Sequence, residues 1–382
     1  MNFRRLFVPV LFLSIACSSL AQSGTTIVDS IISGGIYRKY RLYIPNLYNG
    51  TVARPLVFNF HGLGSNALQQ QVYGNFQPIA DTANFLIVHP EGTLQFGTQF
   101  WNVGVFAGPN DVGFTLDLLD SLAKNYTINK EQVYTTGMSN GAIMSYYLVC
   151  QAPNTFAAMA SVAGTQLRAW FNTCNPLKAV PVMEIHGDAD ATVPYYGSTN
   201  AVYGSFVPVD SVMLKWREHN FCNAQPQITN VPDINISDGC TATDYRWLQG
   251  TDNSSVELYK ITNGSHSWPG APAVFAQTNL DFNASVEIWR FFRKYKRSQF
   301  TQQLSIEQQD VLKKVKLQPN PAENFVHLEL PETATAVLFD ATGKKIMNLQ
   351  TGANKLENLP PGLYTVQIVE AAQRINLKLS KY

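Results

Sequence analysis

One serine between two glycines constrains most strongly how this chain can fold. Residues 137–141 read Gly-Met-Ser-Asn-Gly, directly after the strand-like stretch Gln132–Thr136, and a helix-like run begins at Asn140. A serine on a sharp turn from strand to helix points its hydroxyl above the sheet, and flanking glycines leave room for the tight backbone. The pattern therefore predicts a nucleophile elbow with Ser139 as the nucleophile.

A serine hydroxyl needs a base to take its proton. Three of the six histidines lie far enough downstream of Ser139 with an acidic residue in between, namely His219, His266 and His327. His219 lies in a segment with helical apolar spacing, and His327 lies in a separate C-terminal module. His266 lies in a loop rich in Gly, Ser and Pro at the end of a strand-like stretch, where a mobile base belongs. We therefore predict His266 as the base.

The acid that orients this base is expected after the apolar run Val180–Gly187, which predicts a central parallel strand ending in a turn. Two aspartates compete for the role. We favour Asp190 because it is deeper in the loop and precedes an apolar stretch, Val193–Tyr195, that can bury its carboxylate against the imidazole. Asp188 is expected to shape the turn through its own side chain.

Acyl transfer also needs N–H donors where the carbonyl oxygen becomes negative. One is the backbone N–H of Asn140, at the start of a helix. The other is expected in the turn His61–Gly64, which leaves the apolar strand Pro55–Phe60, and Leu63 is the favoured donor. His61 itself is expected to brace this loop rather than act as a base.

The ordered set of motifs resembles the secreted esterases grouped with poly(3-hydroxybutyrate) depolymerases and feruloyl esterases of the α/β-hydrolase superfamily, over about residues 35–295. The resemblance implies a doubly wound, mostly parallel sheet and a Ser139, Asp190 and His266 triad. It also implies oxyanion contacts at Leu63 and Asn140. Many relatives carry a polar residue or cysteine where Leu63 stands, which affects the polarity of the pocket more than the chemistry. The resemblance also rests on further motifs of this sequence, namely Trp101-Asn102, residues 110–114, Cys150, residues 156–158, His186-Gly187 and residues 264–270.

The resemblance offers two substrate classes for an enzyme acting outside the cell. We favour a serine carboxylic-ester hydrolase of the feruloyl or acetylxylan type, working through an acyl-enzyme, over an extracellular depolymerase of aliphatic or aromatic polyesters. Peptidase action shares the machinery, and a surface-displayed binding protein with a relict pocket is an alternative of another class. Trp268 and Trp101 are expected to line an acyl or aromatic-ring pocket, although either can be a core residue.

Charge and motif content argue against other classes. The 382 residues carry 28 Lys and Arg against 27 Asp and Glu, a formal charge of +1. Such a balance provides no field for binding nucleic acid. No cluster with zinc-ligand spacing and no phosphate-binding glycine motif occurs, so we expect neither a metal nor a cofactor.

The N-terminus reads as a secretory signal. Arg4 and Arg5 precede an apolar run at residues 6–16 and small residues up to Ala21. We predict a signal peptide at residues 1–21. The run is too short to span a bilayer, so a membrane anchor is the weaker alternative, and a lipidated Cys17 is another.

Removal of the signal leaves four cysteines, which in an exported protein are expected to form disulfides. Of the three possible pairings we favour the local one, Cys150 with Cys174 and Cys222 with Cys240. Four buried thiols are the alternative.

The composition of the chain becomes polar after the predicted catalytic domain at residues 22–298. A glutamine-rich linker is predicted at 299–314, and residues 315–382 show short strands with turn signals, typical of a small β-sandwich. Residues 318–321 (QPNP), Gly362–Tyr364 and the lysine-containing C-terminus resemble the sorting domains of the type IX secretion system. This resemblance implies export across inner and outer membranes to the outside or the surface of the cell, with the secretion machinery as a partner. A carbohydrate-binding module is the alternative.

Overall fold

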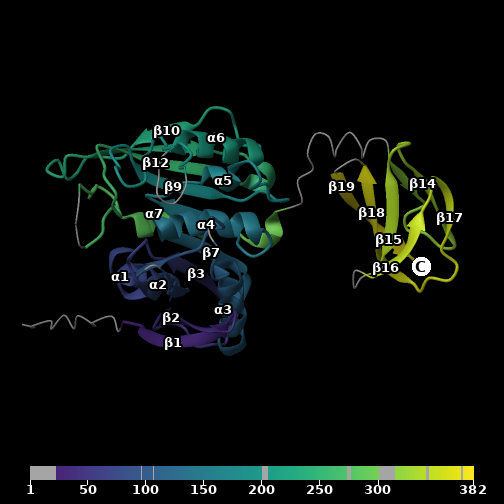
Figure 1. Ribbon diagram of the computed structural model, residues 1–382, viewed down its shortest axis with the longest axis horizontal. Coiled ribbons are helices and arrows are strands. Elements are labelled where there is room, and N and C mark those ends of the chain that lie inside the picture. The colour runs from purple at the N-terminus through teal and green to yellow at the C-terminus, as the bar shows by residue number, and fades with distance from the viewer. Residues whose placement is uncertain are drawn as a thin grey trace, which may run out of the picture. The chain divides into compact units, whose positions relative to one another are not determined.

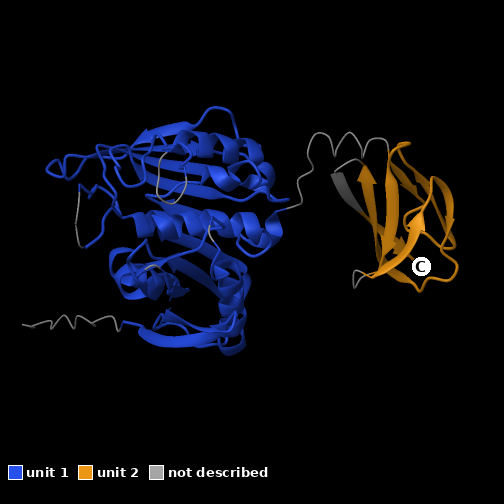
Figure 2. Cartoon of the chain, viewed as in Figure 1, with its two compact units in different colours: residues 1–301 blue, residues 302–382 orange. Residues whose placement is uncertain are grey.

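The computed structural model describes residues 23–95, 97–105, 107–199, 205–272, 277–300, 315–340, 344–370 and 373–382. The predicted signal peptide at 1–21 and residues 301–314 of the predicted linker lie outside these residues. The chain divides into two compact units, residues 1–301 and 302–382 (Figure 2). In the described parts of both units, no helix is long and apolar enough to cross a membrane.

A ten-stranded sheet forms the centre of the first unit, in the order β1-β2-β4-β3-β7-β8-β9-β12-β11-β10 (Figure 1). Its six central strands, from β4 to β12, run parallel, and the strands at both edges are antiparallel. The predicted mostly parallel α/β sheet is therefore confirmed. The strands are β1 (Thr25–Ser33), β2 (Ile36–Ile44), β3 (Arg54–Phe60), β4 (Leu86–Pro90), β7 (Ile128–Met138), β8 (Ala158–Val162), β9 (Val182–Gly187), β10 (Gln227–Asn230), β11 (Thr241–Trp247) and β12 (Val256–Thr262).

Helices cover both faces of this sheet because its central strands are apolar on both sides. In β3, Leu56 and Phe58 join one core with residues of α3, α4 and α6, whereas Val57 joins a second core with residues of α2 and α7. This alternation is the two-residue period of a strand. The helices are α1 (Ala67–Tyr73), α2 (Gln77–Ala83), α3 (Asp111–Asn125), α4 (Asn140–Gln151), α5 (Arg168–Phe171), α6 (Val209–His219) and α7 (Ala284–Phe292), with a hairpin of β5 (Thr93–Gln95) and β6 (Thr98–Phe100) and short 3-10 turns at Thr251–Asn253 and Arg297–Gln299.

The parallel strands bring four loops to one edge of the sheet. β3 ends before the His61–Gly64 turn, β7 before Ser139, β9 before Asp190 and β12 before His266. Since the carboxyl ends of neighbouring parallel strands meet at the same edge, segments separated by more than 200 residues come together there.

The second unit contains two antiparallel sheets that share one apolar core. Val326 and Leu328 from one sheet and Leu338, Val366 and Ile368 from the other belong to the same buried cluster. This arrangement confirms the predicted small β-sandwich. The sheets are β13-β14-β17 and β16-β15-β18-β19, with β13 (Lys316–Gln318), β14 (Phe325–Glu329), β15 (Thr335–Phe339), β16 (Lys345–Leu349), β17 (Gly352–Lys355), β18 (Gly362–Glu370) and β19 (Gln373–Lys381).

The cysteines follow the predicted pairing only in part. Cys150, at the end of α4, is bonded to Cys174, with their Cα atoms 5.0 Å apart. The predicted bond between Cys222 and Cys240 is wrong, because both are free thiols. Cys240 precedes β11, whereas the neighbour of Cys222, Asn223, is hydrogen-bonded just beyond the far end of that strand. Seven strand residues span roughly 20 Å, far beyond the Cα separation of about 7 Å that a disulfide tolerates.

Candidate active site

Ser139 occupies a strained turn between β7 and α4. Its φ of 57° and ψ of −121° lie in a region that L-residues rarely adopt, as a nucleophile elbow requires. The two glycines are needed because the end of β3 passes directly over the turn. A Cβ on Gly137 would lie 2.5 Å from the carbonyl oxygen of Phe60, and one on Gly141 would collide with the same carbonyl and with that of His61.

Asp190 and His266 form a close hydrogen-bonded pair. His266 Nδ1 lies 2.7 Å from Asp190 Oδ2, while Oδ1 accepts the backbone N–H groups of Thr192 and Val193 at 2.8 and 2.9 Å. Burial acts to raise the pKa of Asp190, but its contacts with His186 and His266 outweigh burial and hold that pKa well below its usual range. The ionised carboxylate accepts a hydrogen bond from the Nδ1–H of His266, which leaves Nε2 free to act as a base.

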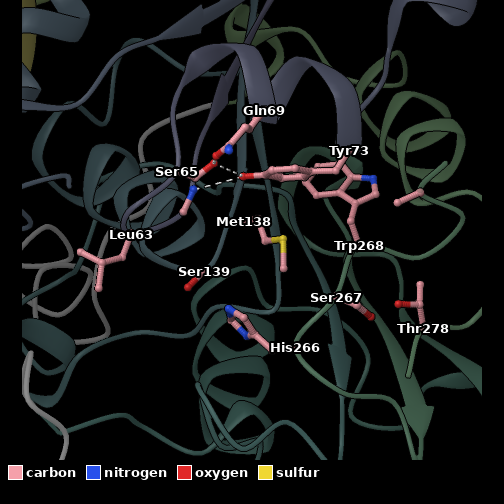
Figure 3. A pocket seen from close by; sticks show the side chains of 12 residues that line it. Leu63, Ser65, Gln69, Tyr73, Met138, Ser139, His266, Ser267, Trp268 and Thr278 are labelled. Atoms are coloured by element: carbon pink, nitrogen blue, oxygen red, sulfur yellow. Dashed lines mark hydrogen bonds between the residues drawn. The ribbon is translucent and has the colours of Figure 1, made fainter. Parts of the chain in front are cut away.

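The histidine and the serine face the same pocket. Figure 3 shows a ring nitrogen of His266 pointing toward the Ser139 hydroxyl, and both residues line the cavity. Among the described residues, no hydrogen bond joins the two side chains. Catalytic contacts of this kind commonly tighten only when substrate binds.

Asp188 serves a different purpose from Asp190. Its carboxylate accepts the N–H of Asn263 at 2.8 Å, and its own N–H donates to the carbonyl of Ile261 at 2.9 Å. The side chain thus joins the loop after β9 to the loop that carries His266, in agreement with the role in shaping the turn that the sequence suggests.

Two backbone N–H groups beside Ser139 match the predicted oxyanion donors. Asn140 is the first residue of α4, so its N–H has no acceptor within the helix. The N–H of Leu63 donates to no carbonyl in the described part of the chain, and Leu63 lines the pocket. A Cβ on the adjacent Gly62 would lie 3.4 Å from Ser139 Cβ, so this turn passes close to the nucleophile.

His61 braces this turn, as expected. Its Nδ1 lies 2.8 Å from the carbonyl of Gly62, and its Nε2 accepts the N–H of Gly92 at 2.9 Å. The hydrogen bonds assign the proton to Nδ1. Burial lowers the pKa of His61, so the ring remains neutral and unsuited to take up a proton.

Trp101 does not line the pocket, which corrects the prediction of a substrate contact. Its side chain is fully buried, and its indole N–H donates to the carbonyl of His61 at 2.9 Å. Its backbone N–H and carbonyl are both held by the side-chain amide of Asn140, at 2.7 and 3.2 Å. Trp101 therefore connects the elbow to the oxyanion turn, and its bulk fills the core behind them.

The cavity has a volume of about 310 Å³ and an aromatic wall. Trp268 lines it as predicted, with its ring 6.4 Å from that of Tyr73 (Figure 3). Sequence reasoning missed the pocket residues that come from α1 and from the turn just before it. Ser65, Gln69 and Tyr73 all line the pocket, and their spacing of four residues is the signal that could have placed them on one helical face.

The remaining histidine candidates lie elsewhere. His219, in α6, contacts the carbonyl of Lys178 at 3.0 Å, and His327 lies on β14 in the second unit. The described residues contain no group of three or more His, Cys, Asp or Glu side chains that could hold a metal ion.

Comparisons with known families match each unit separately. The Prolyl oligopeptidase family matches residues 71–171, a stretch that includes Ser139 but neither Asp190 nor His266. The Secretion system C-terminal sorting domain matches residues 316–381. The second match confirms the predicted sorting domain and, with it, a location outside the cell or at its surface.

Relatives with known names confirm the resemblance to esterases. The chain is 28% identical to the putative esterase NocK of Nocardia uniformis subsp. tsuyamanensis, over 68% of this chain and 80% of NocK. It is 25% identical to the bifunctional acetylxylan esterase/xylanase XynS20E of Neocallimastix patriciarum (63% of this chain) and 25% identical to feruloyl esterase B of Piromyces equi (52% of this chain). It spans only 33% and 38% of the lengths of those two relatives.

A solved structure shows the same fold. The acetyl xylan esterase from Aspergillus awamori superposes with a TM-score of 0.51 at 12% identity, covering 71% of this chain and 99% of that protein. The first unit thus has the α/β-hydrolase fold, and its sequence is similar to those of esterases.

Proposed function

We propose that this protein is an exported serine carboxylic-ester hydrolase of the feruloyl or acetylxylan esterase type. The observation that carries the proposal is the meeting of Ser139, His266 and Asp190 at one edge of the sheet, although they are separated by up to 127 positions in the sequence. A serine on an elbow, an imidazole beside it and a buried carboxylate on that imidazole are the parts that acyl transfer requires.

The geometry supports an acyl-enzyme mechanism. His266 Nε2 takes the proton of the Ser139 hydroxyl, and the serine oxygen attacks the ester carbonyl. The negative oxygen that results lies between the N–H groups of Leu63 and Asn140, and one such donor lowers the barrier by about 3 to 4 kcal/mol in other enzymes. His266 then protonates the departing alcohol, and a water activated by the same ring hydrolyses the acyl-enzyme.

The pocket favours an aromatic acyl group over acetyl. A cavity of about 310 Å³ is large for an acetyl group and suits a ring-bearing acyl chain. Tyr73 and Trp268 provide flat apolar surface for such a ring. The Tyr73 hydroxyl, 3.3 Å from the Ser65 hydroxyl, provides a polar end that can hydrogen-bond a phenolic substituent. We therefore propose feruloyl esters as the preferred substrates. Feruloyl esterase B and XynS20E are named for ferulate and acetylxylan activity respectively.

The second unit supports a reaction that takes place outside the cell. A secretion-system sorting domain implies contact with the secretion machinery, and an exported esterase meets polymeric esters outside the cell. We propose polysaccharide-bound esters as the natural form of the substrate.

Two measurements test the proposal. The full chain should react with a fluorophosphonate probe, and Ser139→Ala should abolish labelling, whereas the neighbouring Ser65→Ala should retain it. Labelling that persists in Ser139→Ala would reject the assignment of the nucleophile.

The substrate class is tested with a panel of methyl ferulate, acetylated xylan, polyhydroxybutyrate film, an aromatic polyester and a peptide. We expect the highest kcat/KM for methyl ferulate. Turnover of a polyester alone would instead support the depolymerase alternative, and turnover of the peptide alone would support a peptidase. Failure to turn over any of them, without probe labelling, would leave a non-catalytic binding protein.

A further inference from the structure

A second histidine lies directly behind the catalytic pair. His186, on β9, is 1% exposed, and both of its ring nitrogens face oxygen acceptors. Nδ1 lies 3.0 Å from the carbonyl of Gly164 and 3.1 Å from Glu184 Oε1. Nε2 lies 2.8 Å from the carbonyl of Val193 and 3.4 Å from Asp190 Oδ2, the same oxygen that His266 contacts.

These contacts determine the protonation of the ring. A neutral imidazole carries one N–H and one lone pair, so in either tautomer a lone pair would face a carbonyl oxygen within 3.0 Å. Only the imidazolium supplies a donor on both sides. Burial opposes the charge, but the hydrogen bonds and charges of Asp190 and Glu184 outweigh it and raise the pKa of His186 to about 10.

Glu184 completes the cluster. It is fully buried, its Oε1 contacts His186, and its Oε2 accepts the hydroxyl of Tyr146, on α4, at 2.8 Å. Such a carboxylate is costly in an apolar core unless a partner balances its charge. Burial raises the pKa of Glu184, whereas its contacts with His186 and Tyr146 act to lower it. Both oxygens face donors, as an ionised carboxylate requires, and the imidazolium is the partner that balances its charge.

The other groups around His186 do not supply a competing charge at the ring. The Tyr195 ring packs on it with centroids 5.8 Å apart, and the Tyr195 hydroxyl donates to Asp210 on α6. Lys260, the register partner of His186 on the neighbouring strand β12, holds its ammonium 4.7 Å from the centroid of the Tyr195 ring. Asp188 is tied to Asn263 instead.

We propose that His186 is a positioning residue, a permanently charged imidazolium that, together with Glu184, fixes the Asp190 carboxylate for His266. The inference rests on the proposed function for its catalytic consequence. Glu184 and His186 add one negative and one positive charge, so the cluster with Asp190 keeps a net charge of −1. His266 therefore experiences the single negative charge of an ordinary triad. Oδ2 of the carboxylate faces His186 as well as His266, while Oδ1 is held by the backbone N–H groups of Thr192 and Val193.

The charge of His186 can be measured without any substrate. In the full chain with nitrogen-15-labelled histidine, we expect the His186 ring to show two protonated nitrogens from pH 7 to pH 9, with His186→Gln identifying its signals. His89, whose two ring nitrogens have no partner among the described residues, should show the neutral pattern in the same spectra. A neutral pattern for His186 at pH 7 would overturn the proposal, whatever the protein catalyses.

The catalytic consequence is tested by charge removal. Glu184→Gln keeps the shape but leaves the cluster neutral, so an imidazolium at His266 becomes harder to form. The acid limb of the kcat/KM profile should move to lower pH by roughly one unit, as expected for a charge roughly 10 Å away at an effective dielectric of about 20. Tyr146→Phe is the matched control, because it disturbs the same carboxylate without changing any charge, and its acid limb should not move.

The outcomes separate the two roles. Equal acid limbs in Glu184→Gln, Tyr146→Phe and the unchanged protein would overturn the electrostatic role, even if kcat falls. If Glu184→Gln does not fold, the spectra of the unchanged protein still decide the charge of His186. An absence of turnover in the unchanged protein would reject the proposed function and leave the spectroscopic result standing.

Discussion

Replacing Asp190 by asparagine should abolish most of the activity through the tautomer of His266. Oδ1 of Asp190 accepts two backbone N–H groups, so the amide oxygen of an asparagine must take that position. Its NH₂ group then lies where Oδ2 now receives His266 Nδ1 at 2.7 Å. Because Nδ1 can no longer donate, the ring proton moves to Nε2, which then cannot accept the serine proton. The same change in another serine hydrolase lowers kcat about 10⁴-fold, or about 5.5 kcal/mol in the barrier.

The assay is kcat/KM with methyl ferulate, alongside the rate of fluorophosphonate labelling and the melting temperature. Asp188→Asn is the matched control, since its side chain can still accept the N–H of Asn263 and does not contact a histidine. We expect it to lose less than about tenfold. An Asp190→Asn protein that keeps a tenth of the activity, or an Asp188→Asn protein that loses as much as Asp190→Asn, would refute the assignment of the acid.

Three further outcomes are expected. Cys222 and Cys240 have pKa values raised to about 11 by burial, so a thiol assay at pH 8 on the chain without residues 1–21, which include Cys17, should detect almost no thiol in the native state and two after unfolding. A bond between Cys222 and Cys240 would give none in either state. Burial lowers the pKa of His89 from 6.5 to about 3, so on acidification the unfolded chain binds a proton before the folded chain does, and stability is lost as the pH falls from about 6.5 toward 3. His89→Met should make the melting temperature less dependent on pH over that range, and an unchanged dependence would contradict this. Trp101→Phe removes one hydrogen bond to the oxyanion turn and should lower kcat/KM about fivefold for every substrate. Trp268→Ala should instead change the ratio of ferulate to acetate turnover. A changed ratio in Trp101→Phe would show that Trp101 contacts the substrate after all.

The elements that the sequence predicts well are those with local causes. The glycines around Ser139 are required by the close approach of β3, and their pattern marks the elbow before any tertiary contact is known. Strands such as β9 and β12 are readable as apolar runs that end in breakers. The choice of Asp190 over Asp188 also has a local basis, because the apolar residues after Asp190 hold its loop and place its carboxylate next to two backbone N–H groups.

What the sequence does not predict depends on distances between segments. Cys222 and Cys240 are close in sequence but lie at opposite ends of a strand, which no cysteine count reveals. Trp101 is an aromatic residue of the kind that often lines pockets. The Asn140 side chain, however, holds its backbone, and its ring lies in the core. The charge of His186 depends on Gly164, 22 positions earlier, and on Glu184 on its own strand.

The loops that carry the acid and the base are joined independently of the pair itself. Gly187 packs directly against Gly264, the N–H of Ala189 donates to the carbonyl of Gly264 at 3.1 Å, and Asp188 accepts the N–H of Asn263. None of these contacts uses the Asp190 or His266 side chains. Removing either catalytic group should therefore leave the two loops in register, so that a loss of activity in such variants reports on proton transfer rather than on collapse of the site. These contacts also require glycine at position 187, since a Cβ there would collide with the Gly264 carbonyl oxygen and force the loops apart, whereas a Cβ on Gly264 would first meet the Ile261 side chain at 2.6 Å.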